Sequence, residues 1–275
     1  MKIYLKTKDF ANSGEEFQLL LDPQLEMLIT DPKPIHIEKY YDSASYISHT
    51  DASTSFIDKM YQRIKKYNLR KKVGQVKHYT NDGHSLLDVG AGTGDFLRSA
   101  EAQGWNTQGV EPSPKARNVA KKKGIHLEER LADVKGKKFD AITLWHVLEH
   151  MPDLENSFRE LSALLEEKGT LFIAVPNYKS FDAQFYGKYW AAYDVPRHLW
   201  HFSKSSIHGY CEKNNLNILA IKPMIFDAFY ISLLSEKYKH GKSSFLKALF
   251  IGLRSNLAAW RTKEYSSLVY VIKRG

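Results

Sequence analysis

The chain has 275 residues, 43% hydrophobic and 26% charged, which is an ordinary composition for a globular protein with one large core. The single cysteine, Cys211, excludes an internal disulfide and a thiolate-rich zinc site, and it fits a reducing compartment such as the cytoplasm. The formal net charge of +9 resides in short basic runs, which are more typical of solvated faces than of a nucleic-acid-binding surface, so nucleic acid is not the expected partner.

The beginning of the chain differs in pattern from the rest. Residues 1–40 contain three prolines and no sustained helical period, which predicts a small strand-and-turn appendage with a poor core of its own. Residues 41–275 are predicted to form the main domain, which begins with a helical pattern between residues 53 and 78.

From residue 83 onward, short apolar runs alternate with helical patterns. This alternation is typical of a parallel sheet with crossover helices. We therefore predict an α/β fold with a seven-stranded, mostly parallel sheet and helices on both faces. The seven predicted strands are HSLLDV near residue 87, NTQGV ending at 110, GIHLE near 126, FDAITL ending at 144, TLFIAV ending at 175, LNILAI near 218 and SSLVYVI near 269.

The first predicted strand runs into a glycine-rich turn, LLDVGAGTGDF. Such a turn between a strand and a helix lets the backbone approach a ligand at the carboxyl end of the sheet. A dinucleotide fingerprint would place its third glycine at position 95, where this chain has Asp95, so NAD is disfavoured. Glu111 ends the second strand, where an acid can accept both ribose hydroxyls of an adenosine. The turn carries Asp88 followed by Gly90, Gly92 and Gly94.

These features together resemble the class I S-adenosylmethionine-dependent methyltransferases, whose first motif is D-x-G-x-G-x-G followed by an acid after the second strand. The resemblance implies a Rossmann-like fold and S-adenosylmethionine as cofactor. It also implies that the glycines contact the amino-acid part of the cofactor, that Glu111 holds the ribose, and that Arg130 and Leu131 flank the adenine. The cofactor contacts that it implies are Tyr41, His49, Asp88, Gly90, Ala91, Gly92, Gly94, Glu111, Pro112, Arg130, Leu131, Trp145 and His146.

Residues 146–150 read HVLEH, a literal match to the H-x-x-E-H pattern of one class of zinc peptidases. Because Pro152 limits any helix there to about one turn and a buried strand precedes the motif, no metal is predicted. In the methyltransferases that the chain resembles, an L-E-H-x-x-D segment continues the fourth strand. His150 is predicted to take a proton from the acceptor, since imidazole has an unperturbed pKa of ~6.5. A histidine that only ties this turn to a neighbouring loop is the alternative.

Residues 177–203 are predicted to form a cap over the acceptor site, because they include nine aromatic residues. Ordinary packing would give the same density. The segments P-R-H-L and H-F-S resemble a signature of the subgroup that includes the ubiquinone-pathway O-methyltransferases. On this resemblance, Arg197 and His198 join His150 as predicted catalytic residues that face the acceptor.

The predicted activity is O-methylation of a small-molecule acceptor, aromatic or lipid-like in character. Methylation of nucleic acid, including RNA, is one alternative that the net charge invites, but the chain lacks an [N/D/S]-P-P-aromatic motif after the fourth strand. A module that binds S-adenosylmethionine without turnover is another. Neither the acceptor nor the oligomeric state follows from the sequence.

No stretch of the chain approaches the ~20 apolar residues that a membrane-spanning helix requires, and the N-terminal residues lack the apolar core of a signal peptide. The basic amphipathic stretch SSFLKALFIGLRSNLAAW, residues 243–260, is predicted to be a helix that covers the core. Peripheral contact with a membrane surface is the alternative.

Overall fold

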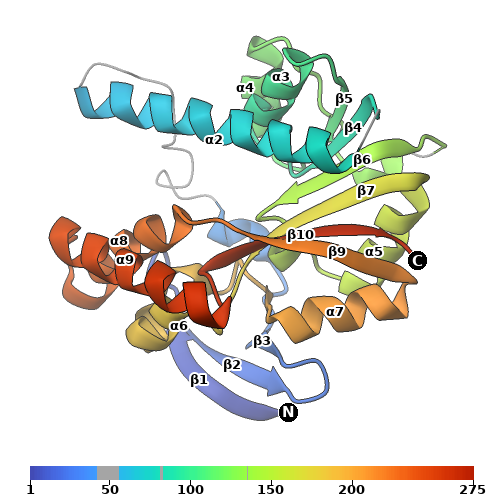
Figure 1. The fold of residues 1–275 in the computed structure, drawn as a ribbon. Helices are drawn as coiled ribbons and strands as arrows, with labels where there is room; N and C mark the ends of the chain where they lie inside the picture. Colours follow the sequence, from blue (N-terminus) through green and yellow to red (C-terminus); the bar gives the residue numbers. More distant parts are fainter. Residues whose placement is uncertain (42–55, 81–82, 135) are drawn as a thin grey trace.

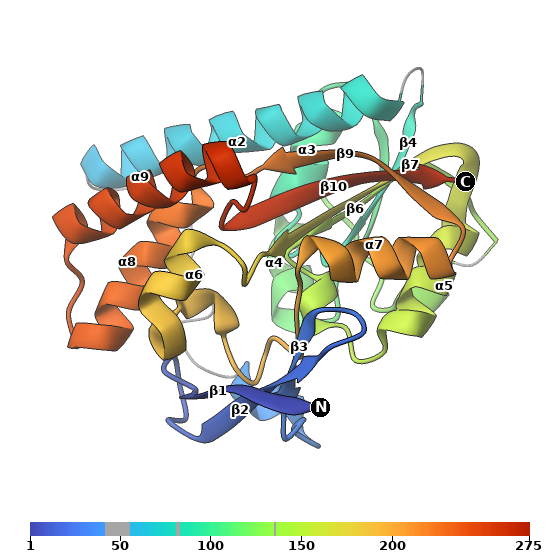
Figure 2. The ribbon, with the colours of Figure 1, turned by 60° about the horizontal axis from the view of Figure 1, so that its bottom comes forward.

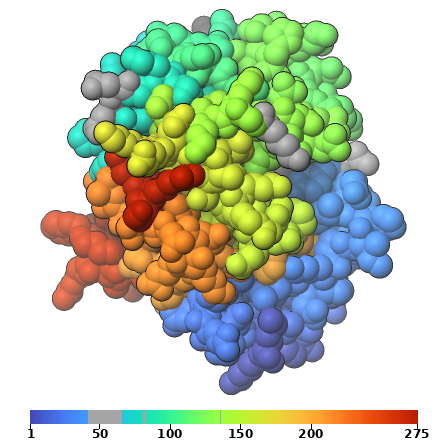
Figure 3. Space-filling model, turned by 90° about the vertical axis from the view of Figure 1, so that its right-hand side faces the viewer, coloured from blue at the N-terminus to red at the C-terminus, as the bar shows by residue number. Residues whose placement is uncertain are grey.

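The computed structural model describes residues 1–41, 56–80, 83–134 and 136–275. A six-stranded sheet lies in the upper half of Figure 1 and a four-stranded sheet lies at the bottom, near the N-terminus. Helices α8 and α9 form a separate block beside the end of the large sheet (Figures 1 and 2). In Figure 3, the N-terminal segment again forms the lower end of the molecule, and part of the red α9 region protrudes from one side.

The large sheet has the strand order β5-β4-β6-β7-β10-β9. Its first four strands are parallel, whereas β10 runs antiparallel to both β7 and β9. The prediction of a mostly parallel α/β sheet is therefore confirmed. The strands are β4 (Ser85–Val89), β5 (Asn106–Val110), β6 (Phe139–Trp145), β7 (Leu165–Pro176), β9 (Leu216–Pro223) and β10 (Ser267–Arg274).

The predicted count of seven strands was wrong by one, because the GIHLE run does not form a strand. It meets β5 at a single bridge between Val110 and Glu128, with one backbone hydrogen bond on each side of Glu128. Two residues later the chain turns, since the Arg130 N–H donates to the carboxylate of Asp133. The run is too short between these points for a ladder to continue.

Helices cover both faces of the large sheet, as predicted. Alternation of side chains along each strand puts Leu86 on one face, with the buried residues of α2, α3 and α4, and Leu87 on the other, with those of α5 and α7. Asp153 caps α5 and Ser203 caps α7 through their side-chain oxygens. The helices are α2 (Phe56–Thr80), α3 (Asp95–Glu101), α4 (Pro114–Lys122), α5 (Leu154–Leu164) and α7 (Lys204–Lys213).

The N-terminal segment forms an antiparallel sheet, β1-β2-β3, that also pairs with β8. Its buried residues, including Phe17 and Leu28, share a core with Trp190 and Tyr193 of residues 177–203. The strand-and-turn prediction is confirmed, and the division at residue 40 stays a prediction. These strands are β1 (Lys2–Lys8), β2 (Glu16–Asp22), β3 (Met27–Asp31) and β8 (Trp200–His201).

Helices α8 (Asp227–His240) and α9 (Phe245–Thr262) are inserted between β9 and β10. The buried face of α9 is made largely of small residues, which lets it lie close against α8 and α6 (Phe181–Tyr186). At Gly252 a Cβ atom would lie 2.6 Å from a ring carbon of Phe229 on α8. The absence of a side chain at Gly252 therefore lets the Phe229 ring pack against the backbone of α9. No helix within the described ranges is long and apolar enough to cross a membrane.

Candidate active site

A cavity of about 830 Å³ lies where β6 and β7 end, between the large sheet, residues 177–203 and the start of α8. This is the edge at which open α/β sheets bind ligands. Its lining combines titratable side chains with apolar ones. The lining includes Lys72, Trp145, His146, Glu149, His150, Asp194, Arg197, His198, Ile225, Phe226, Asp227, Tyr230, Ile231 and Leu234.

The predicted glycine turn and the predicted acid meet in the structure. The Gly92 N–H donates to one carboxylate oxygen of Glu111 at 2.9 Å, and the Ser113 N–H donates to the other at 2.8 Å. Gly92 has a φ of 55°, and a Cβ atom built on it would meet nothing within 4 Å, so the space beside the turn is open. A glycine-rich turn beside a strand-end carboxylate fits the ribose end of an adenosine cofactor.

Asp88 lies beneath this turn, where it ties β4 to β6. The Thr143 hydroxyl donates to its carboxylate at 2.6 Å. Burial raises the pKa of Asp88 to about 7, although the Thr143 hydrogen bond and the charge of Lys72 oppose the shift.

Lys72 was not predicted, because its basic run reads as a solvated helix face. It lies on α2 with its ammonium 4.3 Å from the centre of the Trp145 ring. Burial lowers the pKa of Lys72, opposed by Asp227 and Asp88.

Two buried donors at the cavity lack acceptors. The indole Nε1 of Trp145 and the amide Nε2 of Gln75 have no hydrogen-bond partner among the described residues. Both side chains line the cavity. An orphaned buried donor costs about 1–3 kcal/mol, so both fit a bound cofactor that supplies acceptor atoms at this end of the site.

The HVLEH segment does not present its two histidines as a pair. His146 follows directly after β6 with a φ of 60°, and its Nε2 lies 3.0 Å from Asp227 at the start of α8. Its Nδ1 lies 3.4 Å from Glu149. Burial acts to lower the pKa of His146, but the hydrogen bond to Asp227 and the nearby carboxylate charges of Asp227 and Glu149 outweigh it and raise the pKa to about 9. His146 is therefore a cation at neutral pH.

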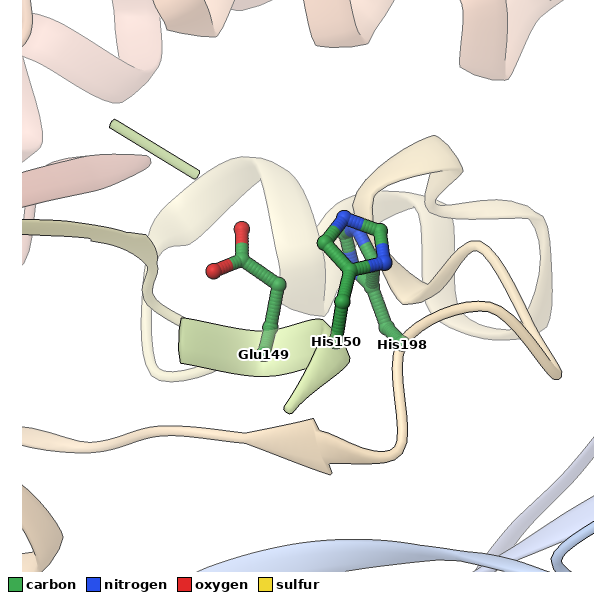
Figure 4. A group of neighbouring side chains, drawn as sticks. All are labelled: Glu149, His150 and His198. Carbon is green, nitrogen blue, oxygen red and sulfur yellow. The ribbon is translucent and has the colours of Figure 1, made fainter. Parts of the chain in front are cut away.

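His150 pairs instead with His198 from the cap, with ring centroids 4.6 Å apart at 80° (Figure 4). The Nδ1 of His150 lies 3.0 Å from the carbonyl oxygen of Arg197, and that of His198 lies 2.8 Å from the carbonyl oxygen of Ala192. Since a carbonyl only accepts, both Nδ1 atoms carry a hydrogen, and Nε2 is the atom at which either ring can take up or release a further proton. Burial, together with His198, lowers the pKa of His150 to about 4, so its ring is neutral.

Glu149 lies next to this histidine pair (Figure 4). Its carboxylate is buried without a hydrogen bond from any described residue. One potential ligand atom from each of Glu149, His150 and His198 lies within 4.8 Å of the others, so the group could hold a metal ion. The expectation that the site uses no metal stays a prediction.

Arg197 is held in a buried ion-pair network. Its guanidinium donates to Asp194 at 2.6 Å, to Asp9 in the N-terminal sheet at 2.9 Å and to the Tyr40 carbonyl at 3.2 Å. These charges raise the pKa of Arg197 despite its burial. We therefore interpret Arg197 as a positioning residue whose carbonyl orients His150, whereas the sequence predicted that its side chain faces the acceptor.

The remaining predicted contacts divide by location. The Tyr41 hydroxyl lies 3.0 Å from Nδ1 of His150, on the histidine side of the cavity. Glu111, Pro112, Arg130 and Leu131 lie outside the cavity lining, and the predicted contacts of these residues with the cofactor stay predictions. His49 lies outside the described residues.

Comparison with known families shows to which family the chain belongs. A family model described as a methyltransferase domain matches residues 61–221, more than half of the chain. The chain belongs to the methyltransferase family. The match spans both the glycine turn of this methyltransferase and its histidine pair.

Relatives named ubiquinone biosynthesis O-methyltransferase align with this methyltransferase. That of Actinobacillus pleuropneumoniae serotype 7 is 26% identical over 176 residues, 57% of this chain and 73% of the relative. That of Albidiferax ferrireducens is 25% identical over 193 residues, 64% of this chain and 75% of the relative. The family match and these relatives confirm the prediction of an S-adenosylmethionine-dependent methyltransferase.

Solved structures share the fold of this methyltransferase. The magnesium protoporphyrin IX methyltransferase of Synechocystis PCC 6803 with bound S-adenosylhomocysteine has a TM-score of 0.56 at 16% identity, covering 87% of this chain and 98% of that chain. With bound S-adenosylmethionine, the same enzyme has a TM-score of 0.53 at 15% identity, covering 87% and 95%. At this identity the likeness establishes the fold.

Proposed function

We propose that this methyltransferase transfers the methyl group of S-adenosylmethionine to a hydroxyl group of a small apolar or aromatic molecule. The observation that carries the proposal is the Nε2 lone pair of the neutral His150, beside His198 in the lining of the cavity. The glycine turn lies close by, since a Cβ atom on Gly90 would meet the side chain of Val147, which follows His146. The relatives named as O-methyltransferases support the same acceptor chemistry.

The cofactor side of the cavity has the groups to hold S-adenosylmethionine. Glu111 is positioned for the ribose hydroxyls, and the open face of Gly92 leaves room for the cofactor beside the turn. The orphaned indole N–H of Trp145 and the ammonium of Lys72 can satisfy a carboxylate at the other end. When bound, S-adenosylmethionine supplies a methyl group on a sulfonium that carries its own leaving group.

The chain then has to align the acceptor and take one proton. The neutral His150 can accept a proton at Nε2, because its Nδ1 donates to a backbone carbonyl. A hydroxyl placed between the two Nε2 atoms can hydrogen-bond to one of them and pass its proton to it as the methyl group arrives. His146 is already protonated, held by Asp227, so it serves as a fixed donor and not as the base.

The apolar wall defines the class of acceptor. Ile231, Leu234 and Ala191 line the cavity, together with the exposed ring of Phe226. Such a wall excludes water and favours an apolar or aromatic body over a charged one.

A double substitution, His150→Gln with His198→Gln, tests the proposal. We expect S-adenosylhomocysteine binding, measured by calorimetry, to stay within about twofold, while turnover against a set of phenolic and other hydroxylated acceptors falls by about 10²-fold or more. His208→Gln, on the outer part of α7, is the matched control. Unchanged turnover in the double variant would contradict the assigned base. Binding without turnover on any acceptor by the unaltered protein would favour a non-catalytic module.

A further inference from the structure

One helix carries much of the exposed apolar surface of the described residues. Of seventeen large hydrophobic side chains that are exposed, seven belong to α9. Leu246 is 78% exposed and Trp260 is 72% exposed, at opposite ends of the helix. The seven residues are Phe245, Leu246, Leu249, Phe250, Leu253, Leu257 and Trp260.

These seven side chains form a continuous stripe, here called the α9 stripe. At about 3.6 residues per turn they fall within an arc of roughly 140° on the outer side of the helix. The opposite side is buried against α6 and α8 and carries Ala248, Gly252, Ser255 and Ala259. The inner contact is therefore satisfied by small residues, and the side chains of the stripe, which is about 24 Å long, are 46–78% exposed.

The charge around the α9 stripe has one sign. Residues 237–263 contain seven lysines and arginines and no aspartate or glutamate. Lys247, Arg254 and Arg261 are spaced by seven residues, so they form a row along one edge of the stripe. Lys247 is paired with the buried Glu236, whereas Arg254 and Arg261 are exposed.

The stripe continues to the mouth of the cavity. Ile225, Phe226 and Tyr230 line the cavity and are also exposed. The side-chain amide of Asn256 on α9 donates to the carbonyl of Ile225 at 3.0 Å, which fixes the helix to this rim.

We propose that the α9 stripe docks this protein, lying flat, on the surface of an anionic lipid bilayer. An apolar arc bordered by basic residues matches a layer with an apolar interior and negatively charged headgroups. A second copy of the chain is a poorer occupant, because a two-fold contact would set the same basic row against itself with no acidic residue between 237 and 263 to pair with it. The proposal does not depend on the identity of the methyl acceptor.

Vesicle flotation with the full chain tests the docking. We expect the protein to float with vesicles of phosphatidylcholine containing phosphatidylglycerol, at least tenfold more than with phosphatidylcholine alone, and this excess to shrink as salt is raised. Leu246→Ser with Phe250→Ser should reduce binding by about tenfold or more, because two apolar side chains that would enter the bilayer are replaced by polar ones. Arg261→Glu with Lys263→Glu should reduce it on the anionic vesicles.

The matched control is Leu219→Ser, which alters an exposed leucine on β9 that lies outside the stripe and should leave vesicle binding unchanged. Trp260 gives a direct readout, since the other four tryptophans are buried or half-buried. Its fluorescence should be quenched by brominated lipids, and Trp260→Phe should remove that quenching.

Three results would overturn the proposal. The first is failure of the unaltered protein to bind either vesicle. The second is equal binding by the stripe variant and the Leu219 variant. The third is that sedimentation velocity shows a dimer of the unaltered protein and a monomer of the stripe variant, while neither protein binds vesicles. This result would mean that the stripe contacts a second copy of the chain. Thermal unfolding midpoints of the variants within a few degrees of the unaltered protein establish that they are folded.

Discussion

The cofactor side and the acceptor side of the cavity are assembled from different parts of the chain. On the cofactor side, Asp88, the glycine turn and Glu111 come from two adjacent parallel strands and lie within 24 residues of sequence. On the acceptor side, His150 is held by the Arg197 carbonyl, and Arg197 is held by Asp9 of the N-terminal sheet. The first arrangement is local and the second depends on contacts between residues more than 180 positions apart. Substitutions on the two sides should therefore change different quantities, such as cofactor affinity on one side and stability or turnover on the other.

The largest effect is expected at Arg197. Replacing it with alanine leaves the buried Asp9 carboxylate without its guanidinium partner, which should lower the free energy of unfolding by about 3–5 kcal/mol. Urea unfolding measures the change. Arg130→Ala is the control, because Arg130 is exposed and its contact with Asp133 is 3.6 Å long, so about 0.5 kcal/mol or less is expected. Equal losses of unfolding free energy in the two variants would contradict a structural role for the buried Arg197 ion pairs.

On the cofactor side, Asp88 should make the free energy of unfolding depend on pH. Its pKa of about 7 in the folded protein exceeds the ordinary value of 3.8, so the stability that it contributes at low pH is lost as the pH rises through 7. Asp88→Asn keeps an acceptor for Thr143 and removes this loss. We expect the variant to gain stability relative to the unaltered protein between pH 4 and pH 8, by roughly 1.4 kcal/mol per pKa unit and about 4 kcal/mol in all.

The measurement is the difference in unfolding free energy between the two proteins at several pH values. A constant difference across this range would contradict the raised pKa.

Glu111 should affect cofactor binding and not folding. Glu111→Gln removes the charged acceptor for the ribose hydroxyls, which should weaken S-adenosylhomocysteine binding by about 1.5–3 kcal/mol, or roughly 10- to 150-fold. Calorimetric titration measures this loss. Glu129→Gln, on an exposed glutamate paired with Arg117, is the control and should change the affinity by less than about twofold. A fall in stability similar to that of the Arg197 variant would remove the distinction between the two sides.

The smallest effect is expected at Tyr41. Tyr41→Phe deletes the hydroxyl that lies 3.0 Å from Nδ1 of His150, and one such hydrogen bond is worth about 0.5–1.5 kcal/mol. We expect turnover to fall about two- to tenfold at unchanged cofactor affinity. Tyr67→Phe, on an exposed ring of α2, should change neither quantity. A selective loss of cofactor affinity would instead assign Tyr41 to the cofactor, as the sequence predicted.

The same contrast explains what could be predicted from the sequence. The glycine turn and Glu111 are readable because strand, turn and acid have fixed spacings, and the sheet brings adjacent strand ends together. The missing strand at GIHLE was not readable, because its end depends on a local turn at Arg130. Lys72 and Asp227 gave no signal, since which face of a helix turns inward at a cavity is set by its tertiary partners.

For HVLEH, Pro152 predicted a helix of about one turn, and the structure has a single turn there, Leu148–His150. The partner of His150 could not be predicted, because His198 reaches it only through the path of residues 177–203. The ion pairs of Arg197 could not be predicted, since the acids that bind it lie in two separate segments, at Asp9 and Asp194.

The buried contact between Asp9 and Arg197 has a practical consequence for protein production. Trimming the N-terminal strands to obtain a minimal domain would remove the carboxylate that neutralises a guanidinium beneath the histidine pair. Such a shortened protein should purify poorly or without turnover even though its glycine turn is intact. The segment after the first strand also supplies Phe10 and Ala11 to the lining of the cavity, so the N-terminal sheet is part of the active site.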